Sequence, residues 1–149
     1  MKQHVKSYGL RTDKSMQTWI QLSRAFNKIS SKEIRYFNEH NLTFNQFKVL
    51  EVLYHRGDLN IGAITKLTMS TPGNITVVVR NLKRDGWIHS VEDSKDKRSI
   101  LLSISTKGKE IIESIFPQHA KNLTDNFQVL NDEELVILYD LLRKLQKSQ

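Results

Sequence analysis

The stretch that decides the fold runs from Ser70 to Gly108 and reads STPGNITVVVRNLKRDGWIHSVEDSKDKRSILLSISTKG. A hydroxyl side chain, Thr71, precedes Pro72, and proline is favoured at the first helical position because its missing N–H costs nothing there. Gly86 lies where a helix that starts at this point would stop. Between them, apolar side chains recur at the spacing of one helical face. The stretch therefore predicts a helix whose buried stripe is Ile75, Val78, Val79 and Leu82.

The same helix contains an unbroken β-branched run from Ile75 to Val79, which by intrinsic propensity favours a strand. That preference is worth only about 0.5 kcal/mol per residue. The Thr-Pro start, the helical spacing and the absence of polar/apolar alternation outweigh it. We therefore predict a helix here.

The opposite face of this helix carries small, hydrogen-bonding or cationic side chains and one methyl-rich side chain. Such groups suit contacts with the base edges and phosphates of DNA. The candidate DNA-contacting residues at and before this helix are Ser70, Thr71, Pro72, Gly73, Asn74, Thr76, Val77, Arg80 and Arg84.

After Gly86 the pattern changes to two apolar segments, residues 87–91 and 99–104, which flank a charged loop. The loop is too polar to be core, so the pattern predicts a two-stranded hairpin with a charged tip. A hairpin of this kind beside the predicted helix is a winged helix. On the second strand Ile100, Leu102 and Ile104 are expected to share one face, and the tip adds the candidate DNA contacts Lys95, Asp96, Lys97 and Arg98.

Two helices upstream complete a helix-turn-helix, and we assign residues 42–104 to the winged helix-turn-helix part. The first begins at Thr43, with Gln46 placed to complete a capping box, and it ends at Gly57. The second is short and capped by Asn60. Its apolar side chains, expected to point inward, are Ile61, Ile64 and Leu67.

Long amphipathic helices are predicted on both sides of this part, over residues 13–38 and 106–147. Residues 1–12 show no periodicity and are interpreted as an arm. The last helix starts with a second capping box, Asn131 and Glu134. Its leucine stripe has too little of this small domain left to cover it, so it is expected to pair with a second copy through Leu135, Leu138, Leu141, Leu142 and Leu145.

Composition fits one soluble domain of 149 residues, with 38% hydrophobic and 26% charged residues. The formal net charge of +7 favours a polyanionic partner, and the basic side chains concentrate between residues 66 and 98. The absence of cysteine excludes disulfides and thiol redox chemistry by this chain. With a polar N-terminus and no long apolar run, the chain is expected to be cytoplasmic and to have no membrane partner.

No pattern in the sequence supports catalysis. The five histidines are scattered, without the paired spacing of metal ligands on one helical face. Neither a glycine-rich phosphate loop nor a nucleophile elbow is present. We therefore predict a protein that is not an enzyme and that needs no metal or cofactor.

In these motifs and their order the chain resembles the MarR family of bacterial transcriptional regulators. The resemblance covers nearly the whole chain, and two further segments, 22–25 and 115–117, are similar to its MhqR-like branch. It implies a mostly α fold with a small β-hairpin wing: a winged helix-turn-helix domain plus N- and C-terminal dimerisation helices, in a single domain over residues 1–149. The motifs that carry it are Leu42 to Phe47, Gly73 to Thr76 with Leu82, Gly86 to Ile88, Asp93, Asp96, Arg98 and Lys107-Gly108.

The resemblance implies a homodimeric, sequence-specific DNA-binding regulator that reads a pseudo-palindromic operator in double-stranded DNA. Arg98 resembles the family arginine that reaches the minor groove or its phosphates, and Asp96 is expected to orient its guanidinium. The alternative function is a winged-helix protein–protein adaptor without specific DNA binding. Two departures from the family pattern keep it open, Arg80 at a commonly acidic position and Ser90 at a commonly basic one.

The resemblance further implies a repressor that a small aromatic effector, phenolic or quinone-like, releases from DNA. Because the chain lacks cysteine, such an effector is expected to act by reversible binding. An apolar junction between the dimerisation helices and the winged helix is the expected pocket. Its candidate wall residues, each of which could equally be ordinary packing, are Trp19, Phe26, Phe44 and Phe47.

Overall fold

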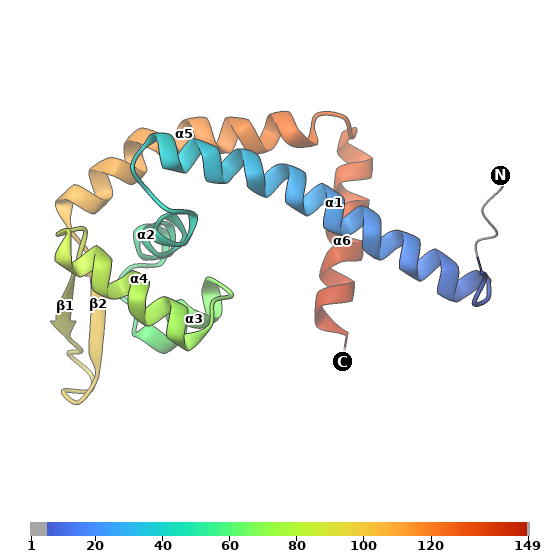
Figure 1. The fold of residues 1–149 in the computed structure, drawn as a ribbon. Coiled ribbons are helices and arrows are strands. Elements are labelled where there is room, and N and C mark those ends of the chain that lie inside the picture. The colour runs from blue at the N-terminus through green and yellow to red at the C-terminus, as the bar shows by residue number, and fades with distance from the viewer. Residues whose placement is uncertain (1–5, 149) are drawn as a thin grey trace.

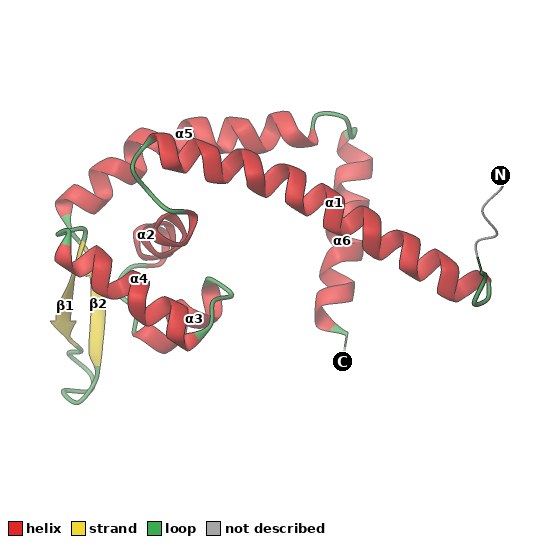
Figure 2. Cartoon of the chain, in the orientation of Figure 1, coloured by secondary structure: helices red, strands yellow, loops and turns green. Residues whose placement is uncertain are grey.

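The computed structural model describes residues 6–148 and confirms a mostly helical fold with one antiparallel hairpin (Figures 1 and 2). Along this described part the elements are α1 (Leu10–Glu39), α2 (Phe44–Arg56), α3 (Ile61–Leu67), α4 (Pro72–Arg84), β1 (Ile88–Glu92), β2 (Ile100–Ile104), α5 (Thr106–Phe127) and α6 (Asp132–Lys147).

The chain divides into a lobe and an arm (Figure 1). Helices α2, α3 and α4 and the hairpin form the lobe, while α1 and α5 run side by side above it and extend away from it. Helix α6 hangs from the far end of α5 and stands apart from the lobe. The lobe therefore carries the predicted winged helix-turn-helix, and the arm carries the predicted dimerisation helices.

Both predicted capping boxes are confirmed. At the start of α2 the Thr43 Oγ1 accepts from the Gln46 N–H at 3.1 Å, and the Gln46 side chain accepts from the Thr43 N–H at 2.9 Å. Asn131 and Glu134 make the same reciprocal pair at the start of α6. Gly57 ends α2 with φ of 81°, a conformation that glycine adopts without steric cost.

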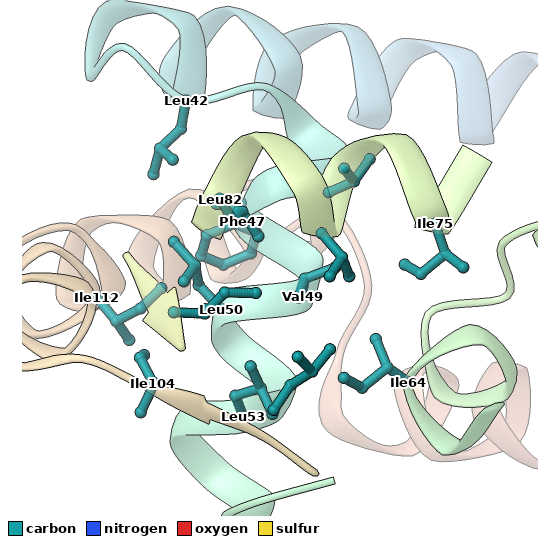
Figure 3. Close-up of a cluster of buried hydrophobic side chains, with 14 of the residues drawn as sticks. Leu42, Phe47, Val49, Leu50, Leu53, Ile64, Ile75, Leu82, Ile104 and Ile112 are labelled. Carbon is teal, nitrogen blue, oxygen red and sulfur yellow. The ribbon is translucent and has the colours of Figure 1, made fainter. Parts of the chain in front are cut away.

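The hydrophobic core surrounds α2. Phe47, Leu50 and Leu53 of this helix lie at the centre of the core (Figure 3). Burying side chains of this size contributes about 1.5–3 kcal/mol each. Gly108, at the start of α5, allows that helix to approach the hairpin, because a Cβ there would lie 2.5 Å from the Trp87 carbonyl oxygen. The predicted stripe of α4 is confirmed as part of the core: Ile75, Val78, Val79 and Leu82 are all buried.

Helix α1 begins earlier than predicted, at Leu10. The prediction that residues 1–12 precede the first helix as an N-terminal arm is therefore wrong for the last three of these residues. The physical reason is Asp13, whose carboxylate accepts from the Tyr8 N–H at 2.9 Å and from the Ser7 hydroxyl. These bonds hold the chain at the helix start, and they lower the pKa of Asp13. Residues 1–5, which belong to the same predicted N-terminal segment, lie outside the described residues.

Three predicted core positions are wrong. Ile61 and Leu67 of α3 are 42% and 45% exposed, because a helix of two turns presents little more than Ile64 to the core. Ile100 is 63% exposed, although it shares a strand face with Leu102 and Ile104. It pairs with Glu92 at the outer end of the hairpin, beyond the reach of the core.

Candidate nucleic-acid interface

Helix α4 is held so that its polar face points outward. Thr71 caps it by accepting from the Asn74 N–H at 3.3 Å, and Pro72 occupies its first turn as predicted. Because the apolar stripe is buried, the opposite side chains face solvent. Of the candidates, Ser70 is half-buried and bonded to Thr68, whereas those exposed are Thr71, Pro72, Gly73, Asn74, Thr76, Val77, Arg80 and Arg84.

The two arginines of this face differ in their surroundings. Arg84 forms a two-pronged ion pair with Asp85, with Nε 2.8 Å from Oδ1 and Nη2 3.1 Å from Oδ2. This pairing lowers the pKa of the Asp85 carboxyl and raises that of Arg84. Arg80 makes no ion pair among residues 6–148. Arg80 is therefore the arginine of α4 whose charge is fully available to a phosphate.

The hairpin pairs Ile88 with Ile104 and carries its charged loop at the far end. The Asp93 carboxylate accepts from the Lys95 N–H at 2.9 Å, and the Asp96 carboxylate accepts from the Arg98 N–H at 3.0 Å. Both aspartates therefore shape the backbone of the tip. Its side chains Lys95, Asp96, Lys97 and Arg98 are all exposed.

The expectation that Asp96 orients the Arg98 guanidinium is not met, because Asp96 bonds the Arg98 backbone and the two make no ion pair in the described chain. The turn explains this, since an aspartate side chain readily bonds the backbone two residues ahead. The guanidinium is thus left exposed for a partner.

The wing, which consists of β1, β2 and the loop between them, is joined to the rest of the lobe by contacts that sequence reasoning missed. Leu59, between α2 and α3, exchanges two backbone hydrogen bonds with Leu102 of β2, at 3.2 and 2.8 Å. The Lys107 ammonium donates to the Asp85 carbonyl at 2.8 Å, and the Ser105 hydroxyl donates to the Gly86 carbonyl at 2.8 Å. These bonds tie the wing to the α2–α3 connection and to the end of α4.

The candidate pocket residues fall into two separate groups. Phe47 is buried and stacks on Phe37, with ring centroids 3.9 Å apart, and Phe44 also stacks with Phe37, at 5.9 Å. Trp19 and Phe26 lie on α1, 67% and 66% exposed. At about 1.5 Å per residue, Trp19 is roughly 27 Å from Phe37 along the helix. Within one chain the four side chains do not line one pocket.

Two shallow hollows lie elsewhere, on the C-terminal part of the chain. One, of about 310 Å³, is lined by apolar residues of α5 and α6 that include Leu123, Phe127 and Leu135. The other is lined by α6 alone, from Tyr139 to Lys147. Both belong to the predicted dimerisation helices and are open to solvent.

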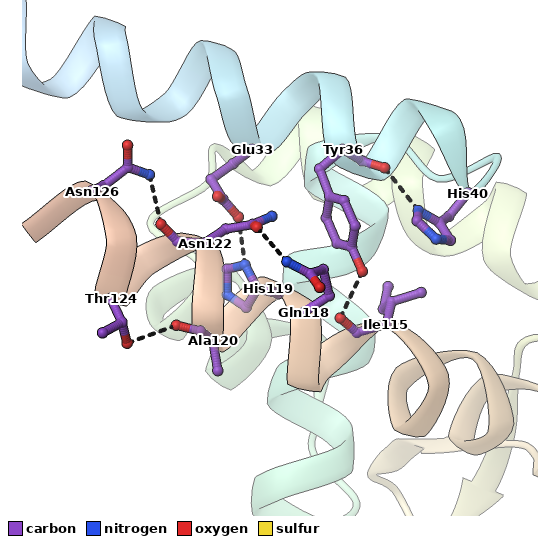
Figure 4. A network of polar contacts seen from close by, with 10 residues as sticks. All are labelled: Glu33, Tyr36, His40, Ile115, Gln118, His119, Ala120, Asn122, Thr124 and Asn126. Carbon is purple, nitrogen blue, oxygen red and sulfur yellow. Dashed lines mark hydrogen bonds and ion pairs between the residues drawn. The ribbon is translucent and has the colours of Figure 1, made fainter.

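A buried hydrogen-bonded pair, Glu33 and His119, joins α1 to α5 (Figure 4). The Glu33 Oε2 lies 2.5 Å from the His119 Nδ1, and both side chains are buried. The His119 ring packs against Phe37 and Phe47, while the Tyr36 hydroxyl donates to the Ile115 carbonyl at 2.9 Å. One sequence signal was available: Glu33 stands four residues before Phe37 on the same helical stripe.

The described residues hold no group of three or more side chains that could bind a metal, and no helix among them is long and apolar enough to cross a membrane. On the lobe, α4 and the wing expose hydrogen-bonding groups, cations and methyl groups. This combination suits DNA.

Comparison with known proteins identifies the family. A family model described as transcriptional regulator SarA/Rot matches residues 34–115, from the end of α1 into α5. The chain is 34% identical over 132 residues to the HTH-type transcriptional regulator YkoM of Bacillus subtilis. The aligned residues cover 89% of this chain and 86% of that protein. The chain belongs to the MarR-type winged-helix transcriptional regulators.

This MarR-type regulator is also 31% identical over 134 residues to MhqR of Bacillus subtilis, with 90% of this chain and 92% of that protein covered. A mutant of MarR from E. coli, solved in complex with operator DNA, superposes with a TM-score of 0.70 at 25% identity. That match covers 86% of this chain and 95% of the other. The predicted family and fold class are confirmed, and the chain is a DNA-binding transcriptional regulator rather than a member of an enzyme family.

Proposed function

We propose that this regulator is a homodimeric repressor that reads a pseudo-palindromic operator through α4 and the wing. The observation that carries the proposal is the outward face of α4, held by its buried stripe beside a wing tip whose cations are exposed. In a two-fold dimer, two such helices enter successive major grooves, with half-sites about one helical turn apart. Family membership, which includes DNA-binding proteins, disfavours the adaptor alternative.

Helix α6 supports the dimer. None of its residues in the described chain is buried, although it is rich in leucine. Helix α1 also carries exposed apolar side chains, Trp19 and Phe26 among them. Large exposed apolar surface is unusual on a soluble monomer and is typical of a protein–protein interface. A second copy of the chain is the partner that this interface fits.

Selection of bound sequences from random duplex DNA tests the proposal directly. The expected result is an inverted repeat with half-sites about one helical turn apart. Repression is tested by in vitro transcription from a promoter that overlaps the selected site, where adding the protein should lower transcript yield. A selection without any sequence preference would favour the adaptor alternative.

Replacing Arg98 with alanine is expected to weaken binding to every duplex, because a phosphate or minor-groove contact from the wing carries little sequence information. The slope of log affinity against log salt should become shallower by about one unit if one phosphate contact is lost. Fluorescence anisotropy at several salt concentrations measures both quantities.

Lys28→Ala, which removes one exposed charge from α1, is the matched control and should leave the slope unchanged. Arg98→Lys keeps the charge and should retain most of the salt slope. Unaltered affinity and slope in the Arg98→Ala protein would show that the wing makes no contact with DNA.

Effector control is the second part of the proposal, and it rests on what the resemblance to the MhqR-like branch implies. We expect a phenolic or quinone-like compound to lower operator affinity and to quench tryptophan fluorescence from Trp19 on α1. Since the chain has no cysteine, dialysis should restore DNA binding. Trp19→Phe protein, which retains Trp87, should lose most of the quenching. A broad panel of such compounds with no effect on fluorescence or affinity would remove this part of the proposal.

A further inference from the structure

Helix α4 presents an apolar side chain at the centre of its outward face. Val77 is 44% exposed and lies one turn beyond Gly73 and one turn before Arg80, directly opposite the buried stripe. A β-branched residue gains little from such a position in a helix, because it loses side-chain freedom without burying its methyl groups. Packing within this chain therefore gives no reason for a valine here.

Gly73 is equally unexplained by the chain itself. It lies in the first turn of α4, and a Cβ built there would meet no heavy atom within 4 Å. Its φ is not in the left-handed region, so alanine would be accommodated and would favour the helix. A glycine at this place suits close approach of a partner to the first turn of α4. Val77 is then the first side chain on the centre line of the face.

Thr76 adds to the apolar character of this face. Its hydroxyl donates to the Pro72 carbonyl at 2.8 Å, so its proton is already used within the helix. What remains for a partner is the methyl group and an acceptor lone pair. The middle of the face thus offers methyl groups, with Asn74 on one side and Arg80 one turn further.

In the major groove, the feature that matches an apolar side chain is the C5 methyl group of thymine. We propose that Val77 is a specificity-determining residue that packs on a thymine methyl in each operator half-site, with Gly73 allowing the approach. The inference rests on the proposed function, because it concerns the same helix in the same groove. It assigns the DNA feature that α4 reads at its centre.

The test replaces each thymine of the selected operator, one at a time, with deoxyuridine, which pairs in the same way and lacks the methyl group. We expect one position in each half-site at which affinity falls roughly fourfold, the effect of one buried methyl-sized group. With Val77→Ala protein, the thymine and deoxyuridine operators should bind with equal affinity. Val129→Ala, at an exposed valine between α5 and α6, is the matched control and should keep the discrimination.

The outcomes separate the inference from the proposed function. A clear operator whose binding is insensitive to deoxyuridine at every position overturns the inference and leaves the proposed function standing. Discrimination that persists in Val77→Ala but disappears in Thr76→Ser overturns the assignment to Val77. A selection that returns no operator overturns both. Because Val77 lies outside the core, thermal unfolding should show that the alanine variant is folded.

Discussion

Protein that carries both Leu138→Glu and Leu142→Glu is expected to sediment as a folded monomer. These residues lie one turn apart on the leucine face of α6, where Leu142 is exposed, Leu138 is half-buried and no described residue is fully buried. Burying a carboxylate against an apolar partner surface is costly, so the two substitutions should prevent association. They should leave the fold of each chain intact, because none of the described α6 residues belongs to the buried core. Sedimentation velocity and circular dichroism measure the two properties.

Loss of the dimer should lower the affinity for the operator. Joining two DNA-binding lobes raises apparent affinity by roughly 10²–10⁴-fold over one lobe, so the monomer should bind a complete operator more weakly by that factor. Binding to a single half-site should change little. Anisotropy with full-site and half-site duplexes distinguishes the two cases.

The matched control for this experiment is Arg143→Gln with Lys147→Gln on the polar face of the same helix. It changes the net charge by the same amount as the two glutamates do, and it should leave the dimer intact. A Leu138→Glu/Leu142→Glu protein that remained a stable dimer would place the interface elsewhere, with the exposed side chains of α1 as the next surface to test.

Sequence reasoning succeeded where the determining interactions are local. The start of α4 depends on Thr71 and Pro72, and the starts of α2 and α6 depend on capping boxes whose partners stand three residues apart. Such signals lie within one helical turn, so the linear sequence contains them whole. The outward face of α4 followed from the same pattern, since burial of one stripe fixes the opposite one.

Sequence reasoning failed where the burial of a side chain depends on how far the core extends. Ile61 and Ile100 have the right spacing for core residues, yet Ile61 lies on a helix of two turns that buries only Ile64, and Ile100 lies at the outer end of the hairpin. The Leu59–Leu102 bridge joins residues far apart in sequence, and no local pattern marks either of them. In the candidate site, the role of Asp96 depended on the conformation of the wing tip.

Sequence reasoning also missed the buried pair of Glu33 and His119, and loss of one partner of this pair is expected to destabilise the fold. The Glu33 Oε1 has no hydrogen-bond partner among the described residues, and Oε2 has only His119. Replacing His119 with leucine would leave a buried carboxylate without a partner. We expect the free energy of unfolding to fall by about 3–5 kcal/mol, measured by urea denaturation at a fixed protein concentration.

The reverse substitution, Glu33→Leu, should cost less, about 1–3 kcal/mol, because the imidazole loses one hydrogen bond but keeps its packing against Phe37 and Phe47. Combining both leucines removes both polar side chains of the buried pair and should restore most of the stability lost in His119→Leu. Gln118→Leu, at the exposed neighbour of His119, controls for the added apolar surface. If the double variant were as unstable as the sum of the single variants, the two side chains would act independently. The packing of α1 on α5 would then depend on the aromatic side chains around Phe37 rather than on the Glu33–His119 hydrogen bond.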